Sequence, residues 1–186
     1  MRRVPLAVLG SLFLAGLAQP TPAQSTIPVS PFSSTYTYAS HTRGFNFQAP
    51  CDFIITALQV PDESAHGLQN VAVINMGNVT TPTGTVTANE LKFYKTGVSS
   101  AAPIPCNVQF KKGEWVCILG ACGDSTTMRN SYGSGGFSSN VLGNPITLNR
   151  LVHQFNLVTS GGLGAISDGG ASSIGRVYVT VTPPTG

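Results

Sequence analysis

Hydrophobic and polar residues alternate with a period of two along much of the chain, which is typical of half-buried β-strands. Residues 35–40 alternate Thr with Tyr, and residues 43–48 place Phe45 and Phe47 on one face. Residues 51–60 are almost continuously apolar and rich in β-branched side chains, so we predict that they form the central strand. The other predicted strands are 69–75, one or two within 85–94, 108–110, 114–119, 145–157 and 174–181.

No window has a sustained helical period with capping residues. The best helical candidate, 146–157, is rich in Asn and Thr and favours a strand. About eight to ten short strands separated by Gly, Pro and Asn turns predict an all-β fold, a single jelly-roll-like β-sandwich. A closed β-barrel is the alternative. We expect the sandwich to span 34–183, after an extended leader at 24–33 and before a short tail at 184–186.

The stretch 111–136 contains the only Trp and the densest run of turn residues. Its pattern predicts a strand, a tight turn flanked by Cys117 and Cys122, a second short strand and a glycine-rich loop at 131–136. A rigid turn beside an adaptable loop is a common way to present binding residues, here Arg129 and Tyr132. The alternative is that the glycines only allow a tight crossover between sheets. A second flexible loop is expected at 161–173.

The N-terminus has the layout of a secretory signal peptide. A basic start, Met1-Arg2-Arg3, precedes an uncharged apolar run at 4–18 and then small residues spaced for cleavage after Ala23, with Ala18 as the alternative site. The apolar run of about 15 residues is shorter than the roughly 20 that a spanning helix needs. We therefore predict a signal peptide at 1–23, a secreted or periplasmic location, and no membrane span after cleavage.

The composition is poor in charge, with 9% charged residues against the usual quarter. Removing Arg2 and Arg3 with the signal leaves eight basic and seven acidic side chains, a net charge of +1. No basic stripe remains, so nucleic-acid binding is not expected. A surface close to neutral resists self-association poorly.

All four cysteines lie in the predicted mature chain, and an even number in an exported protein favours disulfides. Cys117 and Cys122 enclose four residues and are predicted to bridge one turn, which leaves Cys51 to pair with Cys106. Zinc is the alternative, but Cys51 and Cys106 have no Cys or His partner at the two-to-four-residue spacing of zinc sites. We expect disulfides and no metal.

Catalytic signatures are absent from the sequence. No Ser lies in a G-x-S-x-G or S-x-x-K motif, and His66 and His153 read as turn and strand residues. Glu90 and Glu114 are the acids that a sandwich could bring together as a glycosidase pair, although both read as solvent-facing charges. We therefore predict no enzymatic activity and no cofactor.

Calcium is the other metal candidate. Asp124 and Asp168 are loop acids beside Gly, where oxygen-ligand sites often form. The alternative is turn chemistry, in which Asp caps its own backbone. We favour the turn role.

Three groups of segments together resemble those of small exported bacterial β-proteins, several of which carry a C-terminal PEP-CTERM sorting signal. The segments are 42–50 with 53–61, 118–120 through 131–133, and 145–148 to 154–157 with 174–177. The resemblance implies a secreted β-domain and no particular activity. Residues 182–186 show no Pro-Glu-Pro box, apolar helix or basic tail. Surface anchoring by that route is therefore not expected.

Aromatic side chains supply the remaining candidate surface. Tyr36, Tyr38, Trp115 and Tyr132, with Arg129, suit sugar stacking or protein contact if exposed, whereas core packing is the alternative for Trp115. We predict a secreted, non-catalytic structural or interaction protein that is able to self-associate. The alternative is a carbohydrate-binding module for an extracellular glycan, and a secreted hydrolase is third.

Overall fold

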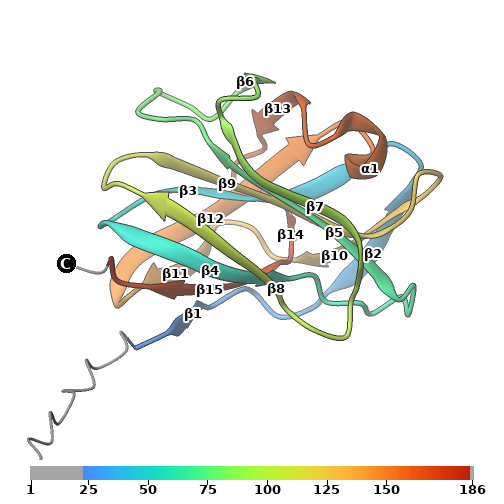
Figure 1. Ribbon diagram of the computed structural model, residues 1–186, viewed down its shortest axis with the longest axis horizontal. Helices are drawn as coiled ribbons and strands as arrows, with labels where there is room; N and C mark the ends of the chain where they lie inside the picture. The colour runs from blue at the N-terminus through green and yellow to red at the C-terminus, as the bar shows by residue number, and fades with distance from the viewer. Residues whose placement is uncertain (1–22, 185–186) are drawn as a thin grey trace, which may run out of the picture.

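Period-two burial along the chain produces two antiparallel β-sheets packed face to face (Figure 1), in a computed structural model that describes residues 23–184. The predicted all-β, sandwich-like fold is therefore confirmed, although fifteen strands form in this range where about eight to ten were predicted. Both sheets keep free edges in this part of the chain, so the closed-barrel alternative is not what forms. The predicted signal peptide, apart from Ala23, and the last two residues lie outside the described range.

The smaller sheet has four strands in the order β1-β15-β4-β8. Their bounds are β1 Ser25–Ile27, β15 Tyr178–Thr182, β4 Phe53–Gln59 and β8 Ile104–Phe110.

The larger sheet has eleven strands, with the main order β14-β10-β9-β3-β12-β13-β6. Strand β2 pairs with β10, β11 with β12, and β5 with both β7 and β9. The bounds are β2 Ser34–Tyr38, β3 Thr42–Gln48, β5 Leu68–Asn75, β6 Gly84–Val86, β7 Leu91–Ser99, β9 Trp115–Gly123, β10 Met128–Gly133, β11 Phe137–Val141, β12 Asn144–His153, β13 Gly164–Asp168 and β14 Ile174–Gly175.

Strand β9 is the most buried strand of the larger sheet, and the prediction of a turn between Cys117 and Cys122 is wrong. The stretch is one continuous strand between β3 and β5, and every residue after Trp115 is buried. Gly120 is needed for close packing, because a Cβ there would lie 2.6 Å from Cγ2 of Val177 and 2.9 Å from Cγ2 of Val60. The glycine therefore lets the two sheets approach instead of marking a turn.

A row of four phenylalanines joins the two sheets in the main core. Phe45 and Phe47 come from β3, Phe53 from β4 and Phe110 from β8, and none is more than 2% exposed. Successive ring centres lie 6.3, 6.3 and 5.5 Å apart. We call these four residues the phenylalanine row.

A second core covers the opposite face of the larger sheet. Cys117, Leu119 and Ala121 of β9 point into it, on the face of the strand opposite to Val116 and Ile118. Short helix α1, Leu157–Ser160, closes this core with the buried Leu157. The helix was not predicted, and its N-cap is the buried Asn156.

Three segments predicted as irregular contain strands. The leader at 24–33 includes β1, whose Ile27 is buried in the main core, because β1 pairs with β15. The loop predicted at 131–136 is largely β10, and the loop predicted at 161–173 contains β13. The segment 51–60, predicted as central, forms β4, an inner strand of the smaller sheet.

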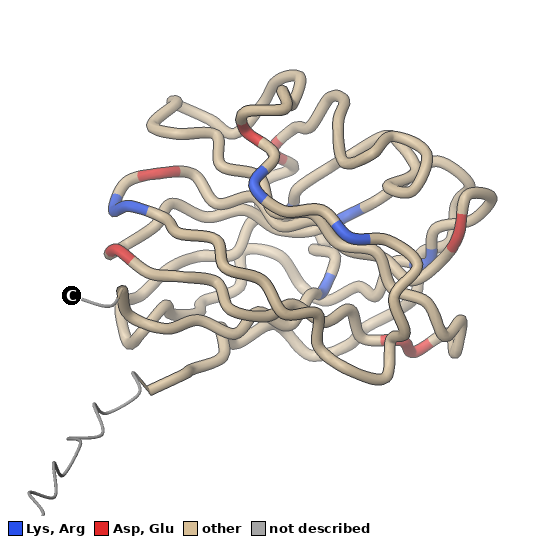
Figure 2. The backbone as a smooth tube through the Cα atoms, in the orientation of Figure 1, with Lys and Arg blue, Asp and Glu red and all other residues tan. Residues whose placement is uncertain are grey.

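Charged residues are few and scattered along the backbone (Figure 2), and two of them, Arg43 and Arg176, are buried. No helix in residues 23–184 is long and apolar enough to cross a membrane.

Candidate functional site

Strands β2 and β10 bring three of the predicted tyrosines onto one face. The antiparallel register pairs Tyr38 with Met128, Tyr36 with Asn130 and Ser34 with Tyr132. Because alternate residues of a strand point to the same side, Tyr36, Tyr38 and Tyr132 share a face of this two-stranded ribbon. Strand β2 lies at the end of the molecule opposite to the marked C-terminus (Figure 1).

The aromatic rings on this face are nearly parallel. Tyr36 lies 6.2 Å from Tyr38 and 5.4 Å from Tyr132, measured between ring centres, with interplanar angles of 8° and 11°. His41 stacks on Tyr38 at 4.1 Å, and its Nδ1 lies 2.7 Å from the Tyr36 hydroxyl. Tyr38 is the most exposed of the four side chains, with 50% of its surface accessible, whereas Tyr36, His41 and Tyr132 are less exposed. We call these four residues the tyrosine surface.

Buried Asn130 holds the tyrosine surface in place. Its Oδ1 accepts a hydrogen bond from the Arg43 backbone N–H at 2.7 Å, and its Nδ2 donates to the carbonyls of Tyr36 and His41. One side chain thus joins β10 to β2, to β3 and to the turn between them. A surface that is fixed before its ligand arrives loses less conformational entropy on binding.

Two arginines lie behind the tyrosine surface. The guanidinium carbon of Arg43 is 5.6 Å from the ring centre of Tyr36, and that of Arg150 is 5.4 Å from the ring centre of Tyr132. Arg150 Nη2 also donates to the Tyr132 hydroxyl at 3.2 Å. The pKa of Arg43 is lowered overall, mainly because the side chain is buried. Tyr132 and Tyr36 raise it, whereas the positive charge of Arg150 lowers it further. The two cations are thus close enough to influence each other.

The histidine of the tyrosine surface is neutral near pH 7. Partial burial, and then the positive charge of Arg43, lower the pKa of His41 from its ordinary value of 6.5. A neutral imidazole accepts or donates hydrogen bonds and offers a flat ring to a ligand.

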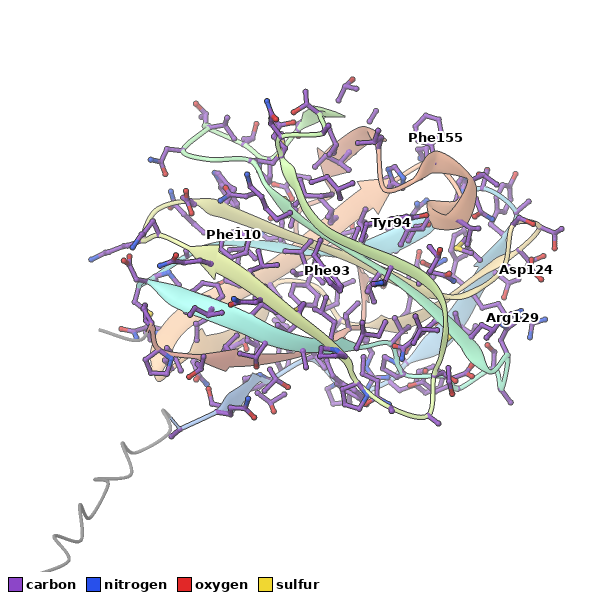
Figure 3. The ribbon with its side chains drawn as sticks, viewed as in Figure 1. Phe93, Tyr94, Phe110, Asp124, Arg129 and Phe155 are labelled. Carbon is purple, nitrogen blue, oxygen red and sulfur yellow. The ribbon has the colours of Figure 1, made fainter. Side chains whose placement is uncertain are left out.

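The other two predicted surface residues lie elsewhere. Trp115 begins β9, is half-buried against the second core and donates from Nε1 to the Val79 carbonyl at 2.8 Å. Arg129 is on the opposite face of β10 and contacts the Ser64 carbonyl. Figure 3 shows Arg129 near Asp124, at the end of the molecule where the β9–β10 hairpin turns. The structure therefore unites Tyr36, Tyr38 and Tyr132 without Trp115 or Arg129.

A third arginine on the far side of β10 has a structural role. Arg176 is 6% exposed and forms an ion pair with Glu63. It also donates to the Ser30 carbonyl, the Ser131 hydroxyl and the Tyr178 hydroxyl. Every polar group of this buried cation is therefore matched, as stable burial of a charge requires.

The predicted disulfides are wrong, since all four cysteines are free thiols. Cys117 and Cys122 lie on one strand with side chains on opposite faces, about 16 Å apart at the usual rise per residue, beyond disulfide reach. Cys51 precedes β4, whereas Cys106 Sγ lies 3.4 Å from the Ile55 carbonyl inside that strand.

Burial keeps the thiols protonated. It raises the pKa of Cys106 to about 11 and that of Cys122 to about 12, and it is also the main cause of the raised values at Cys51 and Cys117. The four cysteines therefore behave as small packing residues with low reactivity.

Both calcium candidates serve as turn caps. Asp124 Oδ1 accepts from the backbone N–H groups of Thr126 and Thr127 and from the Thr126 hydroxyl, which lowers its pKa to about 2. Asp168 Oδ1 accepts from Asn46 Nδ2 and the Gly170 backbone. No group of three or more His, Cys, Asp or Glu side chains within residues 23–184 is arranged to hold a metal ion.

Residues with catalytic potential are engaged in structural contacts. His153 is fully buried, with Nδ1 3.1 Å from the Ala165 carbonyl and Nε2 3.2 Å from the Ser160 hydroxyl, and no carboxylate takes part. Glu90 accepts from Thr87, and Glu114 from the Lys111 backbone. The described residues enclose no pocket for a small molecule.

The sequence did not single out His41, Arg43 or Arg150 as parts of the site. A usable signal was present in residues 43–48, because the alternation that buries Phe45 and Phe47 places Arg43 on the same inward face. A charge at an inward-facing position of a strand indicates a buried polar cluster. Arg150 had no such signal, since it reaches the cluster only through the pairing of β12 with β3.

Comparison with family models, with curated proteins and with solved structures gives no match to this chain in any of the three.

Proposed function

We propose that this chain is a secreted, non-catalytic interaction protein that binds an extracellular glycan through the tyrosine surface. The observation that carries the proposal is the parallel array of aromatic rings on β2 and β10, with Tyr38 half exposed at its end. Rings with adjacent hydroxyl and imidazole groups suit sugar rings, which present apolar faces and hydroxyl edges. The fixed Asn130 contacts support a surface formed in advance.

A glycan array probed with the secreted chain tests this proposal, followed by affinity measurements on Tyr38→Ala. We expect Tyr38→Ala to weaken binding at least about tenfold, the effect of losing about 1.4 kcal/mol at a contact aromatic. Tyr178→Ala is the matched control, because Tyr178 is 38% exposed on the smaller sheet. Equal losses in the two variants, or no saturable glycan binding, would count against the tyrosine surface.

Self-association is a second candidate function, favoured by the exposed edge of β2. Among the described residues, β2 pairs with β10 alone, and its sequence STYTY carries no charge. Uncharged free edges are templates for strand pairing with another copy, whereas β7, another edge strand of the same sheet, carries Lys92 and Lys95.

Light scattering at increasing protein concentration distinguishes this second candidate from the first. Self-association through β2 predicts a mass that rises with concentration and returns to the monomer value in Thr37→Lys, which places a charge on the edge. Tyr38→Ala should leave the mass unchanged. A monomer at all concentrations would contradict self-association.

Two finer predictions accompany the proposal, namely a jelly-roll-like connection of the strands and export by the signal peptide at 1–23. Cleavage after Ala23 is compatible with the start of β1 at Ser25. N-terminal sequencing of the secreted protein tests the cleavage site, and a first residue within β1 or beyond would refute it.

A further inference from the structure

Two cations next to the tyrosine surface have no anionic partner among residues 23–184. All seven acidic side chains lie within the described residues, and neither Arg43 nor Arg150 forms an ion pair with any of them. Arg176, the third buried or half-buried arginine of this region, is paired with Glu63. The acids are engaged elsewhere, at Asp52, Asp62, Glu63, Glu90, Glu114, Asp124 and Asp168.

Burial makes the missing partner significant. Arg43 is only 3% exposed, and its Nη atoms donate to the carbonyls of Thr42 and His153 and to the Gln154 side chain. Its Nε is buried and has no acceptor among the described residues. Buried charges in proteins are normally paired with an opposite charge, because desolvation without one is costly.

The tyrosine surface lies over these two cations. Tyr36 covers the Arg43 guanidinium, and Tyr132 covers that of Arg150 and accepts its Nη2 proton. Arg150 is half-buried, so it is the more accessible of the two arginines. Its Nη1 donates a hydrogen bond to the Ser173 carbonyl. An anionic group bound here would contact the Arg150 guanidinium directly. It would also be attracted by the positive charge of Arg43, which is buried more deeply.

We propose that the tyrosine surface recognises an acidic glycan, whose carboxylate or sulfate group contacts Arg150 while its sugar ring contacts Tyr38. This inference rests on the proposed function and specifies its ligand. A guanidinium presents a planar fork of donors that matches an oxyanion, and the low local dielectric strengthens the contact. A negative ligand would also balance the two adjacent positive charges that the fold leaves uncompensated.

The experiment is isothermal titration calorimetry of the secreted chain with three probes of different charge. Alginate oligosaccharides carry carboxylates, dextran sulfate carries sulfate esters, and unmodified dextran is neutral. We expect one or both acidic probes to bind at least about tenfold more tightly than dextran, and the probe that does so identifies the acidic group. Arg150→Gln should weaken acidic-probe binding about 10- to 100-fold, which is typical of a lost charged hydrogen bond.

Arg129→Gln is the matched control, because it removes the same charge from the opposite face of β10. It should change the affinity less than about twofold, as expected for a half-buried charge that does not contact the ligand. Equal losses in Arg129→Gln and Arg150→Gln, equal affinity for dextran and the acidic probes, or no acidic-probe binding would overturn the inference. So would polyglutamate binding as tightly as the acidic glycans, since charge alone would then suffice.

Two further variants keep the outcomes distinguishable. Should Arg150→Gln fail to fold by circular dichroism, Arg150→Lys keeps the charge and loses the fork, and an unchanged acidic-probe affinity would then refute the bidentate contact.

Tyr38→Ala separates the two proposals. Loss of all glycan binding in Tyr38→Ala, with no effect of Arg150→Gln, leaves the glycan proposal standing and removes the acidic one. Acidic-probe binding that survives Tyr38→Ala but is lost in Arg150→Gln would keep the anion contact with Arg150 and refute the sugar contact with Tyr38, and with it the glycan proposal.

Discussion

Replacing Phe53 by Leu tests whether the phenylalanine row holds the two sheets together through ring contacts as well as through burial. Phe53 is fully buried and is an inner member of the row, with Phe47 on one side at 6.3 Å and Phe110 on the other at 5.5 Å. Leu keeps an apolar side chain in place but removes both aromatic pairs. Phe45→Leu is the matched control, because Phe45 is equally buried and pairs only with Phe47.

The expected loss follows from these contacts. Exchanging one large buried apolar side chain for another costs about 1 to 1.5 kcal/mol at either position. Each lost aromatic pair adds about 0.5 to 1.5 kcal/mol. Phe53→Leu should therefore lower the free energy of unfolding by about 2 to 4.5 kcal/mol, and Phe45→Leu by about 1.5 to 3 kcal/mol. If the ring contacts contribute, the loss of free energy of unfolding should be larger in Phe53→Leu than in Phe45→Leu by the contribution of one aromatic pair.

Urea denaturation followed by tryptophan fluorescence and circular dichroism measures both free energies. In thermal unfolding, each kcal/mol should appear as about 2 to 4 °C for a domain of this size. The double variant Phe47→Leu/Phe53→Leu closes a mutant cycle whose interaction energy should be about 0.5 kcal/mol or more. Identical losses in Phe45→Leu and Phe53→Leu with no interaction energy would show that burial alone explains the row.

Three further predictions concern packing, pH and the thiols. Gly120→Val should destabilise the fold by about 1 to 3 kcal/mol in urea denaturation, since its Cβ would meet Val177 and Val60, and a neutral effect would refute the close approach. Burial lowers the pKa of His153, so protonation favours the unfolded chain; the unfolding temperature should be level from about pH 7.5 to 7 and fall as the pH drops below about 6.5, and a rise there would contradict this sign. Four thiols should react with a maleimide in non-reducing denaturant, and reductant should not change the unfolding temperature, whereas fewer reactive thiols would indicate a disulfide.

The pattern of apolar and β-branched residues predicted several inner strands. The segments 43–48, 51–60 and 69–75 match β3, β4 and β5 within two residues at each end. Strand β9 was predicted only in its first half, at 114–119, because Gly120 between two cysteines resembles a turn. The second short strand predicted after Cys122 corresponds to the first part of β10, whose last residues, 131–133, were predicted as a loop because they are polar or glycine.

The candidate site was predictable only where one strand contains it. Tyr36 and Tyr38 are two positions apart, so their common face follows from the strand period alone. The approach of Arg43 and Arg150 depends on β3 pairing with β12, more than a hundred positions later in the chain. Such a register arises from the whole fold, and no local pattern of hydrophobicity encodes it.

The position of β15 gives the smaller sheet an order of assembly. This strand, at 178–182, lies between β1 and β4, so the earliest and latest strands of the described chain are direct neighbours. A chain emerging from the ribosome can pair β4 with β8, but β1 has no strand to pair with until β15 has been synthesised. Late closure of this kind leaves a nascent chain loose enough to thread through a translocation channel, which suits the proposed export.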